Sequence, residues 1–188
     1  MIPIRYSKRA CEDQAKIDAF LAAAKVGHLG LADGAHPYVI PLNFCWLNGR
    51  IYFHGADAGR KVEIIRKNPN ACFTVSEEFG TIADPIPAHT DTGYMSVMLF
   101  GKVEKVDDPS EMREALQALL DKHVPGYYGQ PLSEQHVMRY RSSLGSPVAV
   151  FRIKPSEWSA KDNPLPEEKH FYPGRTVHQD LRQNDTPE

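Results

Sequence analysis

Residues 26–55 read VGHLGLADGAHPYVIPLNFCWLNGRIYFHG and show the pattern of three consecutive strands. Asp33-Gly34 and Asn48-Gly49 separate the apolar runs, and such dipeptides favour the tight turns of β-hairpins. Both faces of the middle strand, residues 38–47, are largely apolar, as expected for a barrel wall that another subunit covers. Pro41 has no backbone N–H for a neighbouring strand, which indicates a sheet edge or a bulge where backbone groups stay available to a ligand.

The rest of the chain adds three strands and four helices to this region. Apolar patterning predicts strands at 71–77, 94–107 and 147–159, with a polar loop at 79–93. It predicts helices at 11–25, from Arg60 to about residue 68, from Asp108 to about residue 123, and at roughly 133–143. Hairpins come first and helices late, without regular strand–helix alternation. We therefore expect a mainly β fold, a small six-stranded antiparallel barrel with peripheral helices.

The composition narrows the possible functions. The chain has 188 residues, the length of one domain, and a net charge of −2. A general nucleic-acid binder or membrane-surface binder would need an excess of basic residues, so neither partner is expected. No apolar run approaches the roughly 20 residues that span a bilayer. The first residues lack a signal-peptide core, and the three cysteines form no CxxC pair, so we expect a cytoplasmic protein without a metal site.

The helix that begins at Arg60 has an unusual start. Arg60 and Lys61 follow the small residues of GADAG (55–59), with Asp57 as a plausible cap. The N-terminus of a helix carries partial positive charge, so two cations are disfavoured there. A bound anion would reverse this argument, because backbone N–H groups and cations could then share it. The alternative is a solvated helix face with two basic residues and no ligand.

The order of short motifs along the chain resembles a known family. IYFHGA (51–56) is followed by GRK (59–61), NPNACF (68–73) and SVMLFGKVEKVDD (96–108). With PYVIPLNF (37–44), this order is similar to the FMN-binding split barrels related to pyridoxamine 5′-phosphate oxidase, and most similar to nitroimidazole-resistance (Nim-like) flavoproteins. The resemblance covers about residues 10–160 and implies a six-stranded antiparallel split β-barrel. Residues 161–188 remain as a polar tail, extended or packed on a partner.

The resemblance implies FMN as cofactor, bound at the interface of a homodimer. Arg60 and Lys61 would hold the phosphate, and small neighbouring residues would let the backbone approach it closely. His54 lies where Nim-like proteins carry a histidine near the flavin, and it could act as general acid. The other implied cofactor-binding residues are Gly55, Ala56 and Gly59 at the phosphate, Ile40, Pro41, Leu42 and Asn43 at the isoalloxazine ring, Ser96 on the fifth strand, and Trp158 and Lys161 after the last strand.

The implied function is an FMN-dependent oxidoreductase. A reduced nicotinamide would supply electrons for a small-molecule acceptor such as a nitroaromatic or a quinone. Arg175 and His178 do not have the spacing of the C-terminal arginine–histidine motif of the vitamin oxidase, so pyridoxamine phosphate is not the expected substrate. Two alternatives stay open. One is a flavin-binding sensor without turnover. The other is the same barrel with a deazaflavin or with a haem, and His28, His54 or a tail histidine could be the axial ligand of the haem iron.

Overall fold

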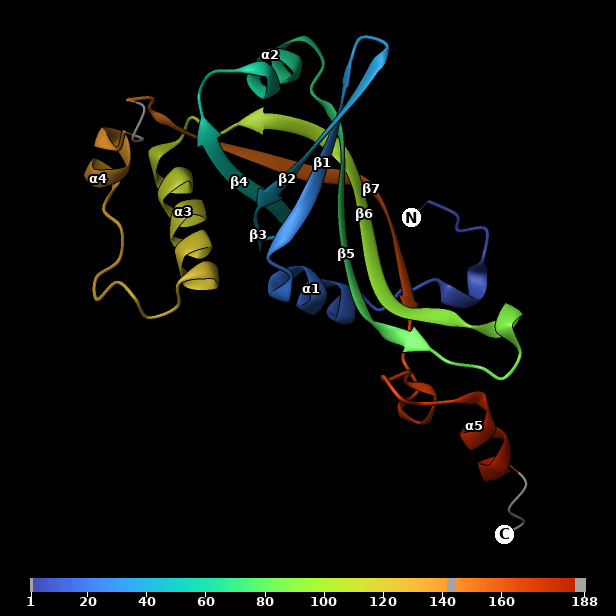
Figure 1. Cartoon of the computed structure of the whole chain (residues 1–188). Helices are drawn as coiled ribbons and strands as arrows, with labels where there is room; N and C mark the ends of the chain where they lie inside the picture. Colours follow the sequence, from blue (N-terminus) through green and yellow to red (C-terminus); the bar gives the residue numbers. More distant parts are fainter. Residues whose placement is uncertain (1, 142–144, 185–188) are drawn as a thin grey trace.

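The computed structural model describes residues 2–141 and 145–184, and its centre is an antiparallel sheet of seven strands (Figure 1). The strands lie in the order β2-β1-β5-β6-β7-β4-β3. Their bounds are β1 Val26–Asp33, β2 His36–Asn43, β3 Cys45–Leu47, β4 Arg50–Ala56, β5 Asn70–Ile82, β6 Asp91–Lys105 and β7 Val148–Asn163. The mainly β antiparallel class that the sequence predicts is confirmed, with one strand more than the six expected.

The extra strand comes from the segment that closes the barrel. Strands β2 and β3 follow each other in the chain with only Phe44 between them, yet they occupy opposite ends of the sheet order. Strand β2 pairs with β1, and β3 pairs with β4. One continuous stretch therefore joins the two edges of the sheet. Phe44, at the change of partner, is fully buried. The prediction of a single strand over 38–47 is wrong for this reason.

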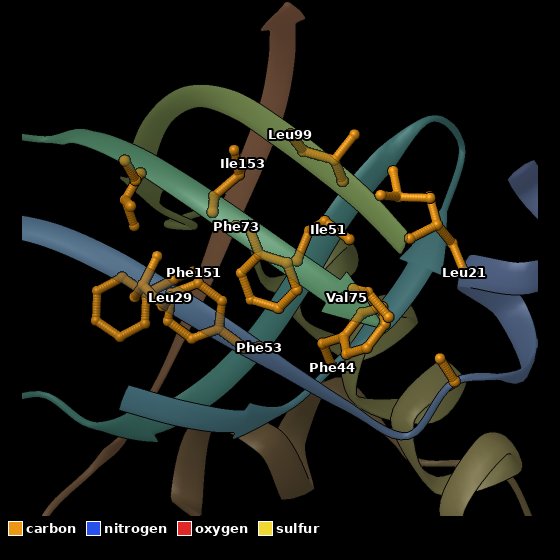
Figure 2. Packing of buried hydrophobic residues seen from close by; sticks show 14 of the residues in the cluster. Leu21, Leu29, Phe44, Ile51, Phe53, Phe73, Val75, Leu99, Phe151 and Ile153 are labelled. Atoms are coloured by element: carbon orange, nitrogen blue, oxygen red, sulfur yellow. The ribbon is translucent and has the colours of Figure 1, made fainter. Parts of the chain in front are cut away.

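Inward-facing side chains of the barrel form the main core (Figure 2). The rings of Phe53 and Phe151 stack with centroids 5.3 Å apart, and Phe44 meets Phe73 edge to face at 5.2 Å. Such aromatic pairs add to the stabilisation from burial alone. Gly27 makes room for this packing, because a Cβ at that position would lie 2.2 Å from Cε1 of Phe73.

Four helices surround the barrel, and the two longest begin with a side-chain cap. They are α1 Gln14–Ala23, α2 Arg60–Lys67, α3 Pro109–His123 and α4 Glu134–Arg139. The side chain of Asp13 accepts from Lys16 N at the start of α1, and that of Asp108 accepts from Glu111 N at the start of α3. Helix α4 is shorter than the predicted 133–143, and residues 142–143 of that prediction lie outside the described residues. No helix in the described part of the chain has the length and apolarity needed to cross a membrane.

Helices α3 and α4 lie together on one side of the barrel (Figure 1). Helix α3 packs on the outer face of β3, β4 and β7, and the contact has its own small core. The carboxylate of Glu111 ties helix to sheet, because it accepts from the Tyr52 hydroxyl at 2.7 Å and from Arg152 at 2.6 Å. The buried members of this second cluster are Cys45, Tyr52, Val106, Ala115, Leu119 and Val150.

Strands β5 and β6 are longer than expected, and the C-terminal segment packs against their far end. The predicted loop 79–93 is wrong at both of its ends, because β5 continues to Ile82 and β6 begins at Asp91. The loop between them holds the 3₁₀ turn η2 Pro87–His89. Gly80 and Gly93 pair across the strands, and a Cβ on Gly93 would lie 2.7 Å from Leu165. The tail is therefore partly docked on the sheet.

The remaining short elements belong to the two ends of the chain. They are the 3₁₀ turns η1 Ser7–Arg9 and η3 Glu167–Lys169 and the helix α5 Val177–Asn184. Backbone bonds join Phe171 N to Thr81 O at 2.9 Å and Ala83 N to Lys169 O at 2.8 Å, which continues the sheet into the tail. Helix α5 itself extends away from the barrel (Figure 1).

Candidate flavin site

The strand register gathers several of the predicted site residues on one outer face of the sheet. Pro41 of β2 lies opposite His28 of β1, and Ser96 of β6 lies opposite Lys161 of β7. Asn43 is two residues from Pro41 and so projects to the same side. One complete row crosses five strands on this face, which we call the outer β1–β2 face: Pro41, His28, Thr74, Met98 and Ser159.

The outer β1–β2 face exposes apolar side chains. Val39 is 61% exposed and Met98 is 39% exposed, and Val26 is exposed beside them. In the described part of the chain strand β2 pairs with β1 alone, so its other edge has no strand partner for its backbone N–H and C=O groups. A flat apolar surface beside open backbone groups suits a planar ring with a polar edge.

Two of the predicted ring-binding residues, Ile40 and Leu42, and the predicted cofactor-binding residue Trp158 do not share this face. The side chains of Ile40 and Leu42 pack against the barrel core, because successive residues of a strand project to opposite sides. Trp158 also packs against the core and lines a small cavity of about 220 Å³ together with Trp46. The run of residues 40–43 therefore cannot line one slot with all four side chains.

The start of α2 differs from the expectation at its cap. Gly59 is the N-cap with φ 100°, a backbone conformation that favours glycine, and no side chain of the described residues caps the helix. Asp57 is not the cap, since its carboxylate pairs with Lys105 at 2.6 Å. The backbone N–H groups of the first turn are therefore free of a side-chain acceptor.

The two cations at this helix start have different surroundings. Arg60 is exposed, donates to the Asp33 carboxylate at 3.1 Å and lies over the Tyr38 ring at 4.8 Å. It therefore already has a partner at the turn between β1 and β2. An exposed pair of this kind contributes little stability and can be exchanged for a stronger anion.

Lys61 is half-buried and has neither an ion pair nor a hydrogen bond among the residues that the structure describes. Its Nζ lies 5.5 Å from the ring centroid of Phe53 and 5.4 Å from that of Phe151. A Cβ on Gly55 would lie 2.6 Å from Nζ, so the glycine leaves the space that the ammonium occupies. Burial lowers the pKa of Lys61. A cation in this state is costly until an anion joins it.

His54 lies on a different side of the barrel from the outer β1–β2 face. It projects outward from β4 opposite Val150 and lines a cavity of about 480 Å³ beneath α3 and α4. Burial lowers the pKa of His54, and the nearby charges of Lys61 and His123 lower it further. The side chain still has exposed surface, because the cavity is open. A neutral imidazole is a poorer general acid at neutral pH, so the proton-donor role stays a prediction.

Sequence reasoning missed the cavity itself. Its walls come from β4, α3, α4 and the connection between the helices, which are far apart in the sequence. The apolar face of α3 was the available signal for the cavity, but an apolar helix face is equally typical of ordinary packing in a protein core. The apolar and aromatic residues of the walls are Leu116, Leu119, Leu120, Tyr128, Pro131, Leu132, Val137, Tyr140 and Val148.

An antiparallel barrel closed by one split strand is the fold of the split-barrel class of flavin-binding proteins. The sequence model of the pyridoxamine 5′-phosphate oxidase family matches residues 13–162, and the chain belongs to this family. The resemblance inferred from the motifs is thereby confirmed. No curated protein sequence matches the chain.

Solved structures with the same fold include three informative relatives. The flavocytochrome Anf3 from Azotobacter vinelandii has 27% identity and a TM-score of 0.73, over 92% of this chain and 79% of that one. A candidate 5-nitroimidazole antibiotic resistance protein from Bacteroides thetaiotaomicron has 26% identity and a TM-score of 0.62, over 81% and 85%. An FAD and haem binding protein from Mycobacterium smegmatis has 17% identity and a TM-score of 0.69, over 95% and 81%, a likeness in fold alone.

Proposed function

We propose that this protein binds FMN in a homodimer and acts as an oxidoreductase on a small acceptor. The carrying observation is Lys61, a half-buried ammonium that has no counter-ion among the described residues and lies at a helix start where none of them supplies a side-chain cap. A phosphate dianion would neutralise this charge and accept hydrogen bonds from the first turn of α2. Arg60 would exchange Asp33 for the phosphate, and Gly55, Ala56 and Gly59 would allow close approach.

The ring would lie along β2, where the outer β1–β2 face and the open strand edge meet. Pro41 and Asn43 would contact it through their side chains, while Ile40 and Leu42 would contribute only backbone groups. Ser96 and Lys161 lie farther across the same face. A second copy of the chain, seated on the exposed Val39 and Met98, would cover the ring and exclude water. Trp158 supports this wall from the core side.

Bound FMN would supply electron transfer between a reduced nicotinamide and a small oxidised acceptor. The residues of this chain would bind the phosphate, orient the ring and keep the site dry. A nitroaromatic or a quinone is the proposed acceptor, and the 26% identity to the nitroimidazole resistance relative supports the first of these. A flavin sensor without turnover is the alternative, and bleaching of the flavin by NAD(P)H separates the two.

The phosphate assignment can be tested with two variants of the same helix. Arg60→Ala/Lys61→Ala removes the basic pair at the start of α2, and Arg66→Ala/Lys67→Ala removes the exposed basic pair at its end. We expect the first variant to lose at least about tenfold in flavin affinity, because two charged phosphate contacts disappear, while the second binds normally. The measurement is the flavin released by denaturation per folded chain, which also identifies the flavin as FMN, FAD or a deazaflavin. Equal flavin content in both variants would refute the assignment.

A second candidate function includes haem beside the flavin. The relative with 27% identity is called a flavocytochrome, a term for proteins that hold both groups. A specific observation favours this candidate in the present chain, namely that His54 and His136 line one largely apolar cavity. A Soret band in the visible spectrum of the purified protein is the expected sign.

A further inference from the structure

The cavity beneath α3 and α4 has the character of a site for a large planar ligand. Its volume of about 480 Å³ falls within the range of cofactor pockets, and most of its walls are aliphatic or aromatic. The barrel wall formed by β4 and β7 closes one side, with His54 and Val148 facing the cavity. Helix α3 closes another side with Leu116, Leu119 and Leu120.

Two imidazoles are the notable polar groups of this cavity. His54 projects from β4 and His136 from α4. The backbone of His54 is held more firmly than that of His136, because β4 is hydrogen-bonded to β7 from Ile51 to Ala56. The imidazole of His54 lines the cavity from a strand that is paired along its length, so one of its ring nitrogens can serve as a metal ligand.

An adjoining hollow adds a cation at the rim. Ser133, His136 and Tyr140 line both the cavity and a more open hollow, and the second also includes Arg139. A ligand with an apolar body and carboxylates at its edge would find apolar walls inside and a guanidinium at the mouth. This distribution fits an iron porphyrin better than a small nitroaromatic, which would leave most of the cavity empty.

We infer that the cavity between α3, α4 and the β4–β7 wall is the haem site, and that His54 is the axial ligand of the iron. The inference rests on the second candidate function and gives it a place and a ligand. The site is separate from the outer β1–β2 face, on another side of the same barrel. Lys61, in the first turn of α2, places its ammonium beside Gly55, the residue that follows His54 in β4.

The test is a titration of the full-length protein with haemin, followed by the Soret band. His54→Gly is compared with His28→Gly, because both histidines are exposed residues of strands and His28 lies on the outer β1–β2 face. We expect His28→Gly to bind like the unaltered protein and His54→Gly to bind more than about tenfold more weakly, as is usual when a metal loses support from its protein ligands. Added imidazole should restore the Soret position in His54→Gly, which a merely structural role of His54 would not produce.

Further variants keep the inference testable if His54→Gly does not fold. Leu120→Trp fills the cavity while leaving His54 in place, and it should also weaken haemin binding. Loss of the Soret band in His28→Gly or His136→Gly, with retention in His54→Gly, would overturn the ligand assignment. Absence of any haemin binding would overturn the site. Flavin content is measured on the same samples, so failure of haem binding is distinguished from failure of the flavin proposal.

Discussion

The barrel has two outward walls, and helices of the same chain cover one of them but not the other. The β4–β7 wall is covered by α3 and α4, and its central residues Tyr52 and Val150 are buried. The outer β1–β2 face exposes Val39 and Met98 instead. Apolar residues that stay exposed together on a sheet mark a surface that a partner covers. One wall is therefore completed within the chain, and the other is completed by a second copy in our proposal.

The largest expected effect comes from the covered wall. Leu119→Ala removes a buried side chain between α3 and the sheet and should lower the free energy of unfolding by about 2–5 kcal/mol. Met98→Ala, on the outer β1–β2 face, should cost less in the monomer, about 0.5 kcal/mol, because the side chain is partly exposed there. Urea unfolding at several protein concentrations measures both values.

The concentration dependence separates the two walls. The cost of Leu119→Ala should not change with protein concentration, since its contacts lie within one chain. The cost of Met98→Ala should grow as the dimer forms, because linkage makes the stability of a dimer depend on concentration. The same cost for Met98→Ala at every concentration would place the dimer contact elsewhere.

A charge on the exposed wall should break the proposed dimer. Val39→Glu would bury a carboxylate without a partner in the proposed interface, which should raise the dimer dissociation constant by about 10–100-fold. Tyr127→Glu is the matched control, at a highly exposed residue of the connection between α3 and α4. It should leave the molecular mass of the proposed dimer in sedimentation unchanged. Sedimentation measures both. Dissociation by the control alone would move the interface to the helical side.

The two walls also show what the sequence could predict. Asn48-Gly49 predicts the hairpin between β3 and β4, and the structure has both residues at positive φ, 51° and 72°. The break at Phe44 was not predictable, because alternation continues through it and the change of partner is a consequence of barrel closure. The full length of β5 and β6 was missed because Leu165, far along the chain, supports the pairing of Gly80 with Gly93.

The candidate site was predictable where the physical reason is local. The clash of Arg60 and Lys61 with a helix start is visible in the sequence, and Lys61 has neither an ion pair nor a hydrogen bond among the described residues. Strand alternation was also available, and it would have separated Ile40 from Pro41 beforehand. The partner of Arg60 is Asp33, 27 residues away, and the walls of the cavity are farther apart still. Such contacts depend on the tertiary fold.

The covered wall holds two titratable groups whose effects on stability oppose each other. Lys122 donates to Leu21 O at 3.1 Å and lies 4.0 Å from the Phe44 ring centroid, and burial lowers its pKa from 10.5 to about 8. Burial raises the pKa of the nearby Cys45 thiol from 9.0 to about 11. Between pH 8 and 10.5 the unfolded lysine holds more protons than the folded one, so this group makes stability rise with pH. Between pH 9 and 11 the folded thiol holds more, so that group makes stability fall.

This pH dependence is a small effect, of order 1 kcal/mol because Lys122 is only half-buried. Lys122→Met should make the free energy of unfolding fall more steeply above pH 9 than in the unaltered protein, since the rise that Lys122 contributes is then lost. Cys45→Ala should make it rise between pH 8 and 10, with Lys61 adding to the rise because its pKa is lowered too. Urea unfolding of flavin-free protein at pH 7, 8, 9 and 10 measures the slopes. Parallel profiles for all three proteins would mean that neither Lys122 nor Cys45 titrates differently in the folded and the unfolded chain.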